Sequence, residues 1–252
     1  MDSKLNSKAQ VTIFIIIGVV IVGSILAVFL LRNNLEIEAP TKAGPQQFIR
    51  SCIEDSIEDS ISKILDGGGK ISPEQTIQYK DENYHYLCYQ ADPYLGCYNL
   101  NPLLEKSIEE EIETDTKELV QECFELLKED FSDKGYFVKE GKTEYSIDLL
   151  PGIVEINLKK KIDISRENTA QSFENFNNQI ISPLYELVGI TRKIVNDESE
   201  YCSFDYVQYM SLYPERSIRK ISYIDSKIYY VLDRDSGEEF RFAIRGCASK
   251  AA

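Results

Sequence analysis

The chain has 252 residues, with 42 acidic and 28 basic side chains and a formal net charge of −14 at pH 7. This balance argues against nucleic acid as a partner, because a phosphate backbone requires a basic face. It also argues against docking of the folded part on anionic lipid. One stretch departs from this polar composition: residues 11–31 contain no charged side chain and lie between Lys8 and Arg32.

Residues 11–31 predict a single transmembrane helix. At about 1.5 Å of rise per residue the stretch can cross a hydrocarbon core of roughly 30 Å, whereas a soluble helix would keep a polar face for water. The run is too long for an ordinary cleaved signal, so we expect a retained anchor in the lipid bilayer. The expected organisation is a basic tail over 1–10, the anchor over 11–31, a tether over 32–44 and an α+β domain over 45–252.

The flanking charges, Lys4 and Lys8 against Arg32 and Lys42, barely set the orientation of this anchor. The signal-like layout and the cysteines favour a cytoplasmic N-terminus. We therefore expect a single-pass cell-membrane protein whose C-terminal domain lies outside the cytoplasm.

The stretch Lys8-Ala9-Gln10-Val11-Thr12 resembles the class III (prepilin-type) signal peptide of archaea. The resemblance implies a candidate processing site between Ala9 and Gln10, where a basic residue and a small residue precede the cut. Pilins also place a glutamate at the fifth mature position, and this chain has Phe14 there. That departure speaks against filament assembly and leaves membrane insertion untouched.

A wider resemblance covers most of the chain. The order KAQVTIFIIIG, then FIRSCIEDSI, then a Gly-Gly-Gly element is similar to that of membrane-anchored proteins of small-genome, DPANN-type archaea. The resemblance implies a place at the membrane and adds no particular chemistry.

The chain contains six cysteines and no C-x-x-C pair: Cys52, Cys88, Cys97, Cys123, Cys202 and Cys247. Zinc prefers closely spaced ligand pairs, so disulfides in an oxidising compartment fit this spacing better. The alternative is a set of buried free thiols in a cytosolic domain. If disulfides form, Cys88 and Cys97 suit a bridge across a hairpin with its turn at Asp92-Pro93, and Cys52 with Cys123 would join two helices. Cys202 and Cys247 then remain as the third pair.

Hydrophobic periodicity predicts helices over residues 45–66 and from Asn101-Pro102 onward for about thirty residues. Asp115 and Thr116 interrupt the second apolar stripe, so we expect that turn to project past the core. Alternating residues over 145–149 and 154–164 predict an antiparallel hairpin around Pro151-Gly152. Lys160 breaks the alternation there, which indicates a bulge or a charged edge strand, or a binding site made by three consecutive lysines.

The last third predicts a helix over 169–196, in which Pro183 is a kink or the start of a second helix with Ser182 as its cap. A short aromatic helix or turn follows over 206–213. Strands over 217–224, 227–232 and 239–244 end the chain, separated by Asp-Ser and Asp-Ser-Gly turns. The expected fold is therefore a set of amphipathic helices packed on an antiparallel sheet.

Catalytic motifs are sparse. His85 is the single histidine, and it lies between two tyrosines in an expected strand with no nucleophile motif beside it. Paired carboxylates could serve a surface hydrolase, which sequence alone does not test. The sequence points to no catalytic residue, metal or cofactor.

Tyrosines crowd residues 79–98. Five of them form a candidate partner-binding surface, because tyrosine offers an apolar ring and a polar tip: Tyr84, Tyr86, Tyr89, Tyr94 and Tyr98. The alternative is that they pack the hairpin onto the helices. The expected function is a membrane-anchored, non-enzymatic structural or interaction protein with a protein partner at the cell surface. The alternatives are a pilin-like subunit processed at Ala9-Gln10 and the hydrolase.

Overall fold

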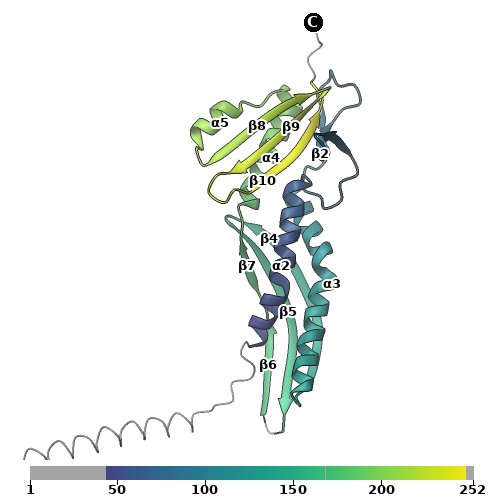
Figure 1. The fold of residues 1–252 in the computed structure, drawn as a ribbon, viewed down its shortest axis with the longest axis vertical. Helices are drawn as coiled ribbons and strands as arrows, with labels where there is room; N and C mark the ends of the chain where they lie inside the picture. The colour runs from purple at the N-terminus through teal and green to yellow at the C-terminus, as the bar shows by residue number, and fades with distance from the viewer. Residues whose placement is uncertain (1–43, 168, 248–252) are drawn as a thin grey trace, which may run out of the picture. The chain divides into compact units, whose positions relative to one another are not determined.

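The computed structural model describes residues 44–167 and 169–247. The expected basic tail, transmembrane segment, candidate processing site and all of the tether except Gly44 lie outside these residues. Within them, no helix is long and apolar enough to cross a bilayer. The described part is an α+β fold in which four helices accompany two sheets (Figure 1).

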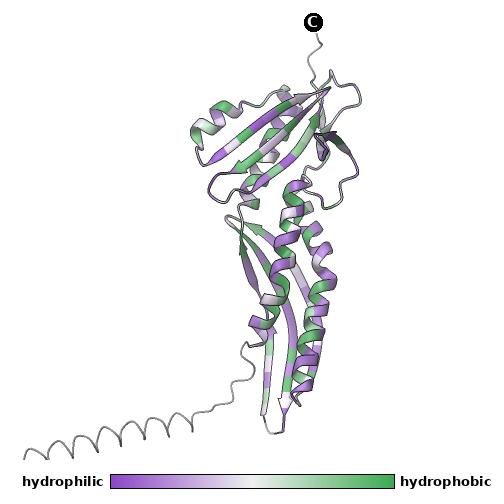
Figure 2. Cartoon of the chain, viewed as in Figure 1, coloured by the Kyte–Doolittle hydropathy of each residue, from purple (hydrophilic) through white to green (hydrophobic). Residues whose placement is uncertain are grey.

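Two long helices, α2 (Pro45–Asp66) and α3 (Leu104–Asp133), pack against each other as the sequence predicts. Figure 2 shows apolar and polar residues alternating along both helices, which is the pattern of an amphipathic face. Glycine ends α2, because a Cβ on Gly67 would lie 1.8 Å from the carbonyl oxygen of Lys70. A side chain at this position would therefore clash with the backbone of the turn that follows α2.

The middle of α3 differs from the expectation. Thr116 is fully buried rather than projecting past the core. Its hydroxyl lies 2.6 Å from the hydroxyl of Tyr145, and Asp115 accepts a hydrogen bond from Ser60 at 2.5 Å. The expectation was wrong because neighbouring elements supply polar partners for the residues that interrupt the stripe.

One sheet is antiparallel and centred on β5, which pairs with β4 along one edge and with β6 and β7 along the other. The β4–β5 hairpin turns at Pro151-Gly152 as predicted, and Gly152 has the positive φ that this turn requires. The strands are β4 (Phe137–Leu150), β5 (Ile153–Arg166), β6 (Thr169–Asn175) and β7 (Asn178–Ile181).

The predicted helix over 169–196 is wrong in its first half, where the chain forms β6 and β7. Phe173, Phe176 and Ile180 have helix-like spacing, but the long β5 strand presents backbone groups that need partners, and pairing with β5 satisfies them. The helix α4 (Leu184–Tyr201) starts only after Pro183. The second-helix alternative is therefore the one observed, but its N-cap residue is Pro183 and not Ser182. The Ser182 hydroxyl still accepts a hydrogen bond from the Leu184 amide at 3.2 Å.

Lys160 occupies an irregular position in β5, as predicted, because the pairing register shifts between Lys159 and Ile162. It does not belong to an edge strand. Its side chain is buried, pairs with Glu140 at 2.8 Å and lies 4.6 Å from the centre of the Phe124 ring. The three lysines therefore do not act together as an exposed basic site.

The second sheet has the order β1-β2-β10-β9-β8, with β3 pairing to β2. It is mixed rather than purely antiparallel, because β10 runs parallel to β2. The helix α4 contacts β9 and β10, and α5 contacts β8. The elements are β1 (Thr76–Tyr79), β2 (Glu82–Tyr89), β3 (Tyr98–Asn99), α5 (Tyr206–Leu212), β8 (Arg216–Tyr223), β9 (Ser226–Asp233) and β10 (Glu239–Arg245).

Candidate functional sites

Every cysteine of the described residues is in a disulfide. The pairs are those that the sequence favoured. Cys52–Cys123 joins α2 to α3 across 71 positions of sequence, Cys88–Cys97 closes a short loop after β2, and Cys202–Cys247 ties the end of α4 to the end of β10.

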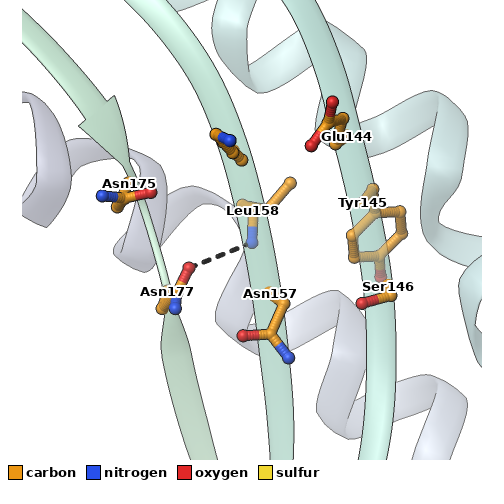
Figure 3. Close-up of a pocket in the computed structure, with 8 residues that line it drawn as sticks. Glu144, Tyr145, Ser146, Asn157, Leu158, Asn175 and Asn177 are labelled. Carbon is orange, nitrogen blue, oxygen red and sulfur yellow. Dashed lines mark hydrogen bonds between the residues drawn. The ribbon is translucent and has the colours of Figure 1, made fainter.

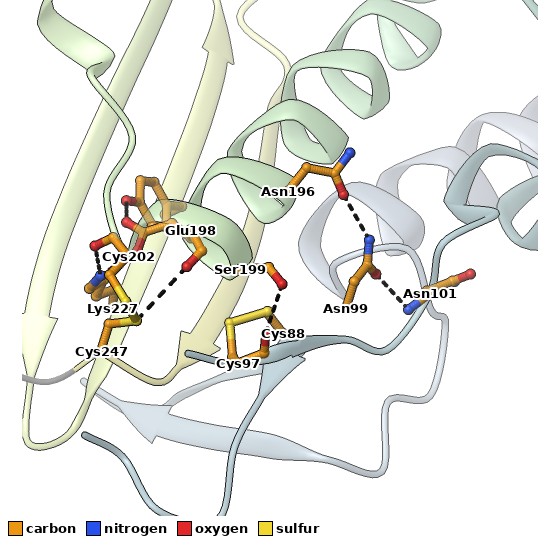
Figure 4. Close-up of a disulfide and its surroundings, with 11 residues drawn as sticks. Cys88, Cys97, Asn99, Asn101, Asn196, Glu198, Ser199, Cys202, Lys227 and Cys247 are labelled. Atoms are coloured by element: carbon orange, nitrogen blue, oxygen red, sulfur yellow. Dashed lines mark hydrogen bonds and ion pairs between the residues drawn. A yellow bond between two sulfur atoms is a disulfide. The ribbon is translucent and has the colours of Figure 1, made fainter. Parts of the chain in front are cut away.

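The loop closed by Cys88–Cys97 is also fixed to α4 by hydrogen bonds (Figure 4). Ser199 donates to the carbonyl of Cys97 at 2.8 Å, and Asn99 donates to Asn196 at 3.2 Å. The bridge and these bonds therefore restrain the same segment of chain.

A buried carboxylate lies beneath the Cys202–Cys247 bridge. Glu198 is 1% exposed and accepts hydrogen bonds from the Lys227 ammonium and the Tyr229 hydroxyl. Lys227 also donates to the carbonyl of Cys202 at 2.9 Å. Burial and the nearby charge of Glu198 raise the pKa of Tyr229, so this phenol remains protonated. The group is a closed ion pair that positions the corner between α4 and β9. Sequence reasoning missed it because Glu198 is one acid among several.

His85 lies in β2, as predicted, and is half-buried. Its Nδ1 donates a hydrogen bond to the carbonyl oxygen of Gly68 at 3.1 Å, since a carbonyl can only accept. Burial lowers the pKa of the imidazole below its ordinary value, so the ring is neutral at pH 7. Through this nitrogen the histidine supports the turn that follows α2.

Replacing His85 by glutamine should flatten the pH dependence of stability on the acid side of neutrality. The pKa of His85 is lower in the folded than in the unfolded chain, so the native protein loses stability as the pH falls below about 6.5. Urea denaturation from pH 7.5 to 5 checks this expectation. An equal slope for the wild type and the His85→Gln variant would contradict it.

The five candidate tyrosines do not form one surface. Tyr84 and Tyr86 are buried, so their rings cannot meet a partner. Tyr89 is half-buried, whereas Tyr94 and Tyr98 are exposed. The proposed surface is therefore wrong as a set. Its exposed members are Tyr94, within the Cys88–Cys97 loop, and Tyr98, just after it.

The buried tyrosines form polar contacts inside the second sheet. Tyr84 donates to Glu82 at 2.5 Å and accepts from Tyr230 at 2.8 Å, and the Tyr86 hydroxyl lies 2.9 Å from Ser226. Burial raises the pKa of Tyr86. These phenols join β2 to the β9 strand across β10, which is a structural role.

A recess of about 320 Å³, lined mostly by polar residues, opens where β6 ends and β7 begins (Figure 3). Asn177 accepts a hydrogen bond from the Leu158 amide at 3.3 Å, and Asn157 donates to Asp148 at 2.7 Å. These amides support the change of strand along the edge of β5. The lining residues are Glu144, Tyr145, Ser146, Asn157, Leu158, Lys159, Asn175 and Asn177.

Among the side chains that the structure describes, no group of three or more histidines, cysteines, aspartates and glutamates could hold a metal ion. No protein-family model, curated protein or solved structure matches this chain. The function is therefore inferred from the chain's own residues.

Proposed function

We propose that this chain is a membrane-anchored protein whose disulfide-bonded domain lies outside the cytoplasm and serves as a structural or interaction module without catalysis. The observation that carries the proposal is the complete pairing of its cysteines into three disulfides. Structural disulfides persist in oxidising compartments and are rare in the cytosol. The apolar residues 11–31 supply the anchor in this proposal.

The chemistry of the described side chains supports an interaction role. All six cysteines are bridged, and the histidine donates to a backbone carbonyl. Cysteine-based nucleophilic catalysis therefore has no free thiol among the described residues. The buried Glu198 is held by Lys227 and Tyr229, so it is committed to structure.

Thiol mapping in native membranes tests the location. We expect a thiol-alkylating reagent, applied under denaturing conditions, to modify no cysteine before reduction and all six after it. Non-reducing peptide mapping should yield the links 52–123, 88–97 and 202–247. Protease added to intact cells should remove the domain. Six free thiols, or a protected domain, would overturn the proposal.

The mass of the mature N-terminus separates a plain anchor from a pilin-like subunit. An intact end bearing Met1, or one lacking only that methionine, supports the anchor. An end at Gln10 supports processing of the prepilin type and moves the proposal toward a pilus-related assembly.

A further inference from the structure

An apolar row crosses one end of the β5-centred sheet. Leu150 pairs with Ile153, which in turn pairs with Ile181 on its other side. Directly opposed residues in antiparallel strands point their side chains to the same face. Leu150 is 38% exposed, Ile153 is half-buried and Ile181 is 88% exposed. Three neighbouring strands thus present branched apolar side chains to solvent, on the face opposite the buried row of Leu149, Val154 and Ile180.

A groove opens at the β7 end of this row, on the face of the sheet that α2 covers. It has a volume of about 340 Å³ and lies between α2 and β7, with Ile181 among its lining residues. Its apolar surface comes from the side chains of Ile61, Leu65 and Ile180. Ile181 belongs to both the row and the groove, so a segment that passes around β7 at this residue would contact both.

Carboxylates border this apolar surface on two sides. Asp148 and Glu155 form the next outward-facing pair of the sheet, and Glu58 and Glu238 line the groove. Within the described part of the chain none of the four is ion-paired.

The hydrogen-bond donors to three of these carboxylates are neutral. Asn157 donates to Asp148, Gln179 to Glu155 and Ser182 to Glu238. Their negative charge is thus left without a cation. Burial raises the pKa of Glu238, and a docked cation would lower it again.

We propose that this apolar row and its groove are a docking surface for a basic amphipathic segment of another protein. Its apolar side chains would cover Leu150, Ile153 and Ile181, and its lysines or arginines would face the four carboxylates. The inference rests on the proposed interaction role and names its surface and partner chemistry. A second copy of this chain fits poorly, because two acidic surfaces of a protein with net charge −14 would repel each other. An anionic membrane surface fits poorly for the same reason.

Binding of a defined probe tests the surface. The full chain is placed in phosphatidylcholine nanodiscs, and a fluorescent amphipathic helical peptide of leucine and lysine is titrated by anisotropy, with empty nanodiscs as background. We expect Ile181→Lys to weaken binding by at least about tenfold. Ile224→Lys is the matched control, because Ile224 is 82% exposed in the β8–β9 turn, and it should change binding by less than about twofold.

Two double variants test whether the carboxylates are needed for peptide binding. Glu58→Gln with Glu155→Gln should weaken binding and reduce its dependence on salt. Glu122→Gln with Glu125→Gln removes the same charge from the exposed side of α3 and should have little effect. The lysine-acetylated peptide should bind weakly to every variant.

Equal binding by the Ile181→Lys and Ile224→Lys variants would overturn the proposal, and so would equal binding of the acetylated peptide. Self-association of the wild type that Ile181→Lys abolishes would assign the surface to a second copy and overturn it too. If the peptide fails to bind while the three disulfides are found and protease removes the domain from intact cells, that result would support the proposed function and contradict only the docking surface. Free thiols would remove the proposed function independently of the peptide.

Discussion

Replacing both Cys52 and Cys123 by alanine should lower the free energy of unfolding by about 4 kcal/mol. The bridge spans 71 positions of sequence, so its loss returns a large conformational freedom to the unfolded chain. It also joins α2 to α3 at a fully buried sulfur of Cys123. Urea denaturation of the full chain in detergent micelles, followed by far-UV circular dichroism, measures the change.

The short bridge provides the matched control. Replacing Cys88 and Cys97 by alanine opens a loop with a sequence separation of only 9, for which the same chain-entropy relation gives roughly 2.5 kcal/mol. A greater loss from the short bridge than from the long one would contradict the entropic explanation. Equal losses would do the same.

Lys227→Met should cost about 3 to 5 kcal/mol of folding free energy at neutral pH. The substitution leaves the Glu198 carboxylate buried with the Tyr229 hydroxyl as its remaining side-chain donor. An uncompensated charge in a nearly water-free site is expensive. Urea denaturation of the variant gives the loss directly.

A double substitution separates this charge effect from lost packing. Glu198→Gln added to Lys227→Met should recover much of the loss, because a neutral amide needs no cation. Lys134→Met removes an exposed ion pair with Asp130 and should cost roughly 0.5 kcal/mol or less. If the two lysine variants lose the same stability, Lys227 does not compensate a buried charge.

Much of the fold follows from local pattern. The four-residue recurrence of Ile49, Ile53 and Ile57 predicts α2 with its buried face, and Gly67 predicts its end. The alternation around Pro151-Gly152 predicts the β4–β5 hairpin. In these segments the residues that specify an element lie within the element, so tertiary contacts reinforce the pattern and do not override it.

The wrong predictions concern segments whose structure depends on residues far away in the sequence. The chain over 169–181 has helix-like apolar spacing and becomes β6 and β7, because the edge of β5 needs partners. The parallel pairing of β2 with β10 and the burial of Tyr84 depend on residues more than a hundred positions away. The candidate docking row could not be predicted, because Leu150 and Ile181 become neighbours only through Ile153 between them.

The parallel contact between β2 and β10 also bears on the order of events during synthesis. Tyr86 lies opposite Ala243, so the second sheet cannot close until β10 has emerged, more than 150 positions after β2. The α2, α3 and β4–β7 elements are complete well before that point and can assemble first. Until β10 arrives, the β2 edge and its apolar side chains remain without this neighbour, and an unpaired strand edge favours misassembly.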